Sequence, residues 1–126
     1  MAVHVHVSDD AVDIQFSGID KWITLNPSGQ HLAMADVTGA RVVPRPEAKV
    51  GRGWRVGGGH WADWLATGWF TVKDRKGVRE LWCVYRDEEV LVIDTVLDKP
   101  CRVVLQHPDR HDLAWYIGER LARQSP

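Results

Sequence analysis

The stretch TGWFTVKDRKGVRELWCVYRDEEVLVIDTVLDKPCRVVLQ, residues 67–106, determines the fold class of this chain. Short segments rich in β-branched and aromatic residues alternate in it with turn formers such as Asp74-Arg75-Lys76-Gly77 and Asp98-Lys99-Pro100. One strand and its turn take roughly 10 to 12 residues, a spacing typical of an antiparallel meander. We therefore predict successive antiparallel strands at residues 67–73, 78–86, 90–94 and 101–106.

The N-terminal residues alternate between apolar and polar side chains. Valines at positions 3, 5 and 7 are separated by His4 and His6, and the same period continues with Val12, Ile14 and Phe16. A period of two indicates strands, and Ser8-Asp9-Asp10 between the runs indicates a turn. We predict a β-hairpin, then a short helix within residues 17–25, extended segments at 30–35 and 39–43, and an end to regular structure at Pro44 and Pro46.

The C-terminal residues follow a helical period. Leu113, Ile117 and Leu121 are four residues apart, and His107-Pro108-Asp109 precedes them with residues that suit a helix start. This pattern predicts one amphipathic helix whose apolar stripe covers a sheet. With 126 residues and no linker or repeat, we expect a single domain spanning residues 1–126.

The segment around Trp82 is apolar on both faces. Leu81, Cys83 and Tyr85 point one way, and Trp82 and Val84 point the other. A strand buried on both sides needs a further covering element, which would be the helix, the tryptophan-containing loop or another subunit. We interpret Cys83 and Cys101 as buried strand thiols rather than a disulfide.

Charge and hydropathy exclude several classes of protein. The formal net charge is −1, so the chain lacks the overall basic character of a nucleic-acid binder or of a polybasic membrane anchor. Its apolar runs are short, about four residues, against the roughly 20 that span a bilayer. We therefore expect no nucleic-acid partner, no transmembrane segment and, without a secretory signal at the N-terminus, a cytoplasmic protein.

No group of residues predicts catalysis or a cofactor. The glycines after Gly51 do not match a dinucleotide or nucleoside-triphosphate loop, and the serines lie in turns or near the C-terminus without an elbow motif. His4 and His6 share one face of a strand and could bind a metal only if a third ligand converged. We predict no catalytic residues, no cofactor and no metal, and keep a histidine site across a dimer as a weaker hypothesis.

Residues 51–70 carry four of the seven tryptophans among glycines. Tryptophan and arginine are favoured at binding hot spots, and glycine permits unusual backbone shapes. Trp61 and Trp64 fall in the irregular part, with Trp54 and Arg55 close by. We therefore predict partner or ligand binding by Trp54, Arg55, Trp61 and Trp64; the alternative is a lid that folds over the sheets.

The order of these elements resembles a known family. The residues that carry the resemblance are the hairpin His4–Asp10, the short helix Ser17–Lys21, the segment Ala35–Val42, the Gly53-Trp54-Arg55 loop, Thr67-Gly68-Trp69-Phe70, and Arg102-Val103-Val104-Leu105 with the helix that follows His107-Pro108-Asp109. Together they resemble small, uncharacterised actinobacterial proteins with a pleckstrin-homology-like (PH-like) domain. The resemblance implies a mainly β split barrel of two bent antiparallel sheets closed by a C-terminal α-helix, and no enzymatic activity.

Two features of the sequence depart from the family pattern. Gly58-Gly59-His60-Trp61 lacks the proline that usually follows in the family's loop, and the first turn is acidic where phosphoinositide-binding members are basic. Phosphoinositide binding is therefore not expected.

The leading hypothesis is a non-catalytic PH-like domain for protein–protein interaction or self-assembly. The alternative is a small-molecule binder or enzyme that uses the tryptophans and the barrel end.

Overall fold

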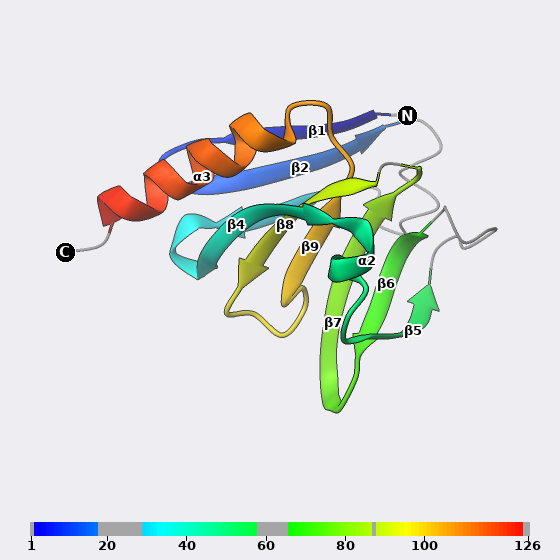
Figure 1. Ribbon diagram of the computed structural model, residues 1–126. Coiled ribbons are helices and arrows are strands. Elements are labelled where there is room, and N and C mark those ends of the chain that lie inside the picture. Colours follow the sequence, from blue (N-terminus) through cyan, green and yellow to red (C-terminus); the bar gives the residue numbers. More distant parts are fainter. Residues whose placement is uncertain (1, 18–28, 58–65, 87, 125–126) are drawn as a thin grey trace.

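The computed structural model describes residues 2–17, 29–57, 66–86 and 88–124, and these form two β-sheets with a C-terminal helix (Figure 1). Strands β1 (Ala2–Val7), β2 (Ala11–Ser17) and β3 (Gln30–Ala33) pair in that order in the smaller sheet. Val7 pairs with Val12 across the acidic turn, so the predicted N-terminal hairpin is confirmed. The short helix predicted within residues 17–25 lies almost wholly outside the described residues.

Helix α2 (Arg45–Ala48) occupies the position where we expected irregular chain. It follows strand β4 (Val37–Pro44), which a short 3-10 turn, Met34–Asp36, separates from β3. The prediction that Pro44 and Pro46 end regular structure is wrong, because Pro46 lies in the first turn of α2. A helix does not use the N–H groups of its first turn, so it loses nothing by having proline there.

The larger sheet has the order β4-β8-β9-β7-β6-β5 among the described strands. Its remaining strands are β5 (Arg52–Gly57), β6 (Ala66–Val72), β7 (Arg75–Val84), β8 (Glu89–Thr95) and β9 (Arg102–Leu105). Strand β9 lies between β8 and β7, antiparallel to the first and parallel to the second.

The predicted antiparallel meander is therefore wrong for the strands after β7. Strands β7 and β8 lie two strand spacings apart, about 10 Å, with β9 between them. Val103, Val104 and Leu105 of β9 are fully buried, and a central position gives this short strand a pairing partner on each side. Cys101 lies one residue before β9 rather than within it, and its backbone N–H bonds to Arg79.

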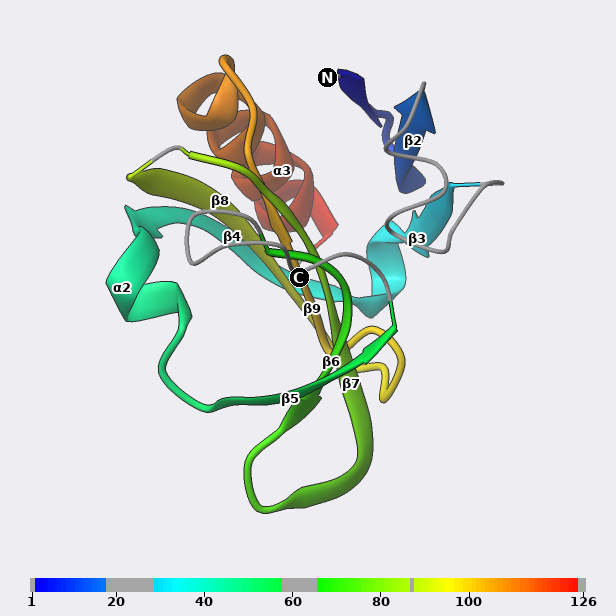
Figure 2. The ribbon, with the colours of Figure 1, turned by 90° about the vertical axis from the view of Figure 1, so that its right-hand side faces the viewer.

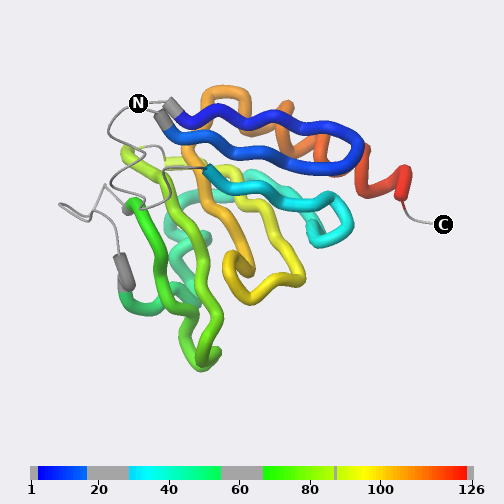
Figure 3. The backbone as a smooth tube through the Cα atoms, turned by 180° about the vertical axis from the view of Figure 1, so that it is seen from behind, coloured from blue at the N-terminus to red at the C-terminus, as the bar shows by residue number. Residues whose placement is uncertain are grey.

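One face of the larger sheet packs against the smaller sheet and helix α3 (Arg110–Gln124), as Figures 1 and 3 show. Side chains from all three meet in one apolar core, to which α3 contributes Leu113 and Ile117. The predicted amphipathic C-terminal helix is thus confirmed, and His107 precedes it as expected. In the described part of the chain, no helix has the length and apolar character needed to cross a membrane.

The opposite face of the larger sheet forms a second core beside α2 and β5 (Figure 2). Phe70, Trp82, Val92 and Val104 lie in it with Ala48 of α2. Strand β7 is therefore buried on both faces, as its sequence predicted. The mainly β fold with two sheets is confirmed, but the described strands do not close into a barrel.

Candidate functional site

Strand β7 places one carboxylate among apolar side chains. Residues 81 and 83 point toward the smaller sheet, so Glu80 lies on the other face with Trp82 and Val84. The parallel register pairs Leu81 with Val103, which brings Arg102 of β9 beside Glu80. Strand alternation therefore places a positive and a negative side chain together at one end of the second core.

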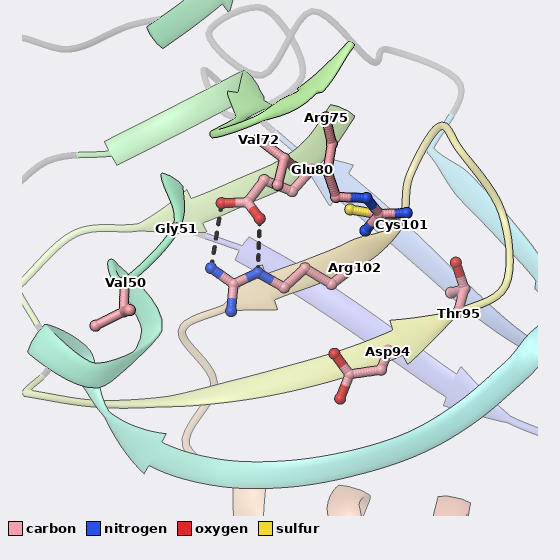
Figure 4. Close-up of a pocket in the computed structure, with 9 residues that line it drawn as sticks. All are labelled: Val50, Gly51, Val72, Arg75, Glu80, Asp94, Thr95, Cys101 and Arg102. Atoms are coloured by element: carbon pink, nitrogen blue, oxygen red, sulfur yellow. Dashed lines mark hydrogen bonds and ion pairs between the residues drawn. The ribbon is translucent and has the colours of Figure 1, made fainter. Parts of the chain in front are cut away.

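Arg102 and Glu80 form a bidentate ion pair (Figure 4). Nε of Arg102 donates to Oε2 of Glu80 at 2.7 Å, and Nη2 donates to Oε1 at 3.2 Å. The side chain of Glu80 is 2% exposed and that of Arg102 is 13% exposed. The indole Nε1 of Trp82 also donates to Oε1 at 2.9 Å, and Arg102 Nη2 donates to the carbonyl of Ala48. The three hydrogen bonds donated by Arg102 and Trp82 hold the carboxylate of Glu80 in place.

Arg52 of β5 adds a second guanidinium to this face. Its Cζ lies 4.6 Å from the ring centroids of both Phe70 and Trp82. Burial lowers the pKa of Arg52, Glu80 raises it, and the positive charges of Arg45 and Arg102 lower it further. Nη1 of Arg52 is buried and has no hydrogen-bond acceptor among the described residues.

A third arginine lies nearby, at the start of α2. Arg45 is only 7% exposed, and its Nη1 donates to the carbonyl of Tyr85 at 2.6 Å. Glu80 and the guanidinium groups of Arg45 and Arg102 therefore all lie close enough to Arg52 to shift its pKa.

A cavity of about 250 Å³ opens beside the Arg102–Glu80 pair (Figure 4). Arg75 reaches over Cys101 on one side of it, and Asp94 lines the other side. Asp94 is held by Arg41, whose Nε donates to its Oδ2 at 3.2 Å. Burial raises the pKa of Cys101, and the charge of Glu80 adds to the effect, so the thiol stays protonated near neutral pH.

A second depression, of about 450 Å³, lies on the outer strands of the same sheet. We call it the Trp54 surface; its lining residues are Arg52, Gly53, Trp54, Thr71, Val72, Lys73 and Asp74. The indole of Trp54 is 84% exposed, although its backbone N–H is held by Oγ1 of Thr71 at 2.7 Å. A Cβ on Gly53 would collide with that same hydroxyl, so glycine permits the close approach of β5 to β6.

The sequence-predicted binding residues are only partly described. Trp54 is exposed, as a binding residue requires, and Arg55 lies next to it in β5, with its backbone paired to Phe70. Trp61, Trp64 and the glycine-rich segment before them lie outside the described residues, so their role stays a prediction. Sequence reasoning missed the cluster around Glu80, although one signal was present: a charged residue at 80 in phase with Trp82 and Val84.

The histidines do not gather with other ligands where they are described. His4 and His6 are exposed on β1, and no group of three His, Cys, Asp or Glu side chains in the described residues could hold a metal. His111 of α3 instead pairs with Glu89 at 2.9 Å, and Arg110 pairs with the same oxygen at 3.0 Å. Glu89 is the first residue of β8, and its side chain is 42% exposed. These two bonds lower its pKa.

Comparison with known proteins adds no relative. No family model matches the sequence, and no curated protein or solved structure is significantly similar to it.

Proposed function

We propose that this chain is a non-catalytic interaction domain of the PH-like class, which binds a protein partner through the Trp54 surface. One observation carries the proposal: Trp54 is 84% exposed on β5, an outer strand of the larger sheet. Tryptophan is enriched at binding hot spots, and Trp54 lines a depression into which a partner's side chain could fit.

Charge supports a partner with acidic residues. The β6–β7 hairpin beside Trp54 extends beyond the other strands (Figures 1 and 3) and carries Lys73, Arg75, Lys76 and Arg79 against Asp74 alone. Among the described residues, Lys73, Arg75 and Lys76 form no ion pair with a carboxylate. The net charge of the chain conceals this local basic surface.

The same charge disfavours self-association through this surface. In a two-fold symmetric dimer the same patch meets its own copy, so the cations would face cations. We therefore favour a different protein over a second copy. The free thiols of Cys83 and Cys101 are consistent with a reducing, cytoplasmic location for this interaction.

The test compares Trp54→Ala with a matched control, Trp115→Ala. Trp115 is also exposed, at 61%, but lies on α3, which packs against β4 at the edge of the larger sheet opposite to β5. Partners captured from the native organism are purified and titrated against each variant. Loss of a hot-spot tryptophan costs about 2 kcal/mol or more, so we expect affinity to fall about thirtyfold for Trp54→Ala and to stay unchanged for the control.

Three results would contradict the proposal. In the first, Trp54→Ala binds the purified partner as tightly as the unsubstituted protein does. In the second, sedimentation shows a dimer that Trp54→Ala dissociates, which would assign the surface to self-association. A nucleic-acid competitor is included because the hairpin is basic; displacement of the partner at low concentrations of nucleic acid would also count against a dedicated protein-binding surface.

A further inference from the structure

We infer that the outward face of helix α3 binds the same face of a second copy of this chain, in an antiparallel, two-fold symmetric dimer. Helix α3 packs against β4, at the edge of the larger sheet opposite to β5 among the described strands. The two Trp54 surfaces of such a dimer therefore stay accessible, and the dimer does not depend on their role in partner binding.

Two aromatic side chains lie next to each other on this face. Trp115 is 61% exposed and Tyr116 is 45% exposed, and their ring centroids lie 5.4 Å apart in an edge-to-face arrangement. The opposite face of the helix carries Leu113 and Ile117, which are buried against the two sheets. The fold therefore leaves both outward rings exposed, and adjacent exposed aromatic rings are typical of an interaction surface.

Gly118 leaves room for a large side chain one turn after Trp115. Gly118 and Ala122 follow Trp115 by three and seven residues, so the three residues lie along one side of the helix, and all are exposed. A Cβ on Gly118 would meet nothing within 4 Å outside its own helix, so packing among the described residues does not require glycine there. Glycine weakens a helix interior, and the close approach of a second helix gives it a use. In an antiparallel pair, each Trp115 indole lies over Gly118 of the other copy.

The charges at the two ends of this face match an antiparallel copy. Asp112 in the first turn and Arg123 in the last turn are exposed, and neither forms an ion pair among the described residues. The register that sets Trp115 over Gly118 brings Asp112 of one copy to within about 3 Å, along the helix axis, of Arg123 of the other. Two-fold symmetry makes this contact twice, and the helix dipoles also oppose favourably. A parallel pair would instead set like charges against each other.

The same charges disfavour a membrane surface as the occupant. Helices that lie on anionic bilayers carry polar faces rich in lysine and arginine. Asp112 and Glu119 accompany Arg123 on the outward side of α3, whereas Arg120 pairs with Asp9 of the β1–β2 turn at 3.1 Å. The outward face therefore has no excess of positive charge that would attract anionic lipid.

The length of α3 sets the expected strength of the dimer. The helix has 15 residues, so the paired faces are about 22 Å long, and the last turns of α3 extend past the ends of the two sheets (Figures 1 and 3). One helix pair of this length buries less than the roughly 800 Å² per subunit of a standard interface. We therefore expect a reversible dimer with a roughly micromolar dissociation constant.

Sedimentation equilibrium from micromolar to millimolar protein measures this association. Trp115→Ala should raise the dissociation constant at least about thirtyfold, the effect of losing a hot-spot tryptophan. The matched control is Trp54→Ala, which also removes an exposed indole but lies on β5, and it should leave the dissociation constant unchanged.

Gly118→Leu separates loss of the dimer from loss of the fold. The leucine side chain fills the space that the indole of the second copy needs, so the protein should sediment as a monomer. Urea unfolding of that monomer should need at least as much denaturant as the unsubstituted protein, because leucine favours a helix more than glycine does and has open space at this position.

An exchange of charges tests whether the occupant is a second copy. Asp112→Arg alone and Arg123→Asp alone should each weaken the dimer about tenfold or more, because each sets like charges against each other twice. The double variant restores both opposite-charge contacts, so its dissociation constant should return to within about threefold of the original. A different protein would meet two wrong charges and bind the double variant worst of all.

Three outcomes overturn the inference. The first is an unsubstituted protein that stays monomeric at millimolar concentration, and the second is a double variant that dimerises no better than the single ones. The third is Trp115-dependent binding of something else by a monomer: vesicles of anionic phospholipid would assign the face to a membrane surface, and a purified heterologous protein would assign it to that protein.

Discussion

Removing the buried carboxylate of Glu80 should be among the most destabilising single changes in this protein. Glu80→Ala deletes the acceptor for Arg102 and for the indole N–H of Trp82. Arg102 would stay buried without a counter-charge, and Arg52 would lose the one nearby group that favours its protonated form. Breaking a buried ion pair by removing one partner typically costs about 3–5 kcal/mol.

Urea unfolding at pH 7 measures this effect. Domains of this size are stable by about 5–15 kcal/mol, so the loss would remove about a fifth of the total or more, and the unfolding midpoint would fall accordingly. The control is Glu88→Ala, an exposed carboxylate one residue before β8, which should change stability by less than about 0.5 kcal/mol.

A double variant tests the cause. If the cost comes from an unpaired buried charge, Glu80→Ala combined with Arg102→Leu should be more stable than Glu80→Ala alone, because the double variant buries no lone guanidinium. The reasoning is refuted if Glu80→Ala costs less than about 1 kcal/mol, or if the two single losses simply add.

Three further outcomes follow from the described contacts. Gly53→Ala should lower the free energy of unfolding by about 1–3 kcal/mol, because the added Cβ would displace the Thr71 hydroxyl. An unchanged free energy of unfolding in urea contradicts this. The pKa of Glu89 is lower in the folded protein than its unfolded value of 4.5. The stabilisation by its bonds to Arg110 and His111 is therefore complete above pH 4.5 and is lost as the pH falls through the folded-state pKa. Glu89→Gln should therefore flatten stability against pH in the acid range, and a parallel pH profile would refute that. In the native protein, Cys101 should react with iodoacetamide more slowly than a free thiol, and buried Cys83 should not react until the protein unfolds; equal rates would show that neither thiol is shielded.

Local patterns predicted the elements better than their arrangement. Strict alternation in residues 3–16 and the four-residue spacing of Leu113 and Ile117 correspond to confirmed elements, because each pattern has a single buried face to satisfy. Strand β9 is different. Its apolar residues could pair with β8 alone or lie between β8 and β7. Turn residues mark where a strand ends but do not specify which strand it pairs with.

The candidate site was less predictable for a related reason. Glu80 and Arg102 are 22 residues apart in the chain, and only the parallel β7–β9 register brings them together. The meander predicted from the sequence would have placed β8 between them. The buried ion pair therefore depends on the one strand pairing that turn signals could not reveal. Trp54, by contrast, was predicted as a binding residue from its position among glycines and beside Arg55.

Trp82 and Trp54 show how the sheet assigns different roles to one residue type. Trp82 lies on β7, is fully buried and donates to Glu80, whereas Trp54 lies on outer strand β5 and is mostly solvent-exposed. Trp82→Phe should reduce stability by about 1–3 kcal/mol, because it leaves Glu80 short of one donor, and partner affinity should be unaffected. Trp54→Ala should weaken partner binding and leave stability unchanged. If both variants lose stability equally and neither loses a partner, the indole of Trp54 serves the fold and the proposed interaction surface is wrong.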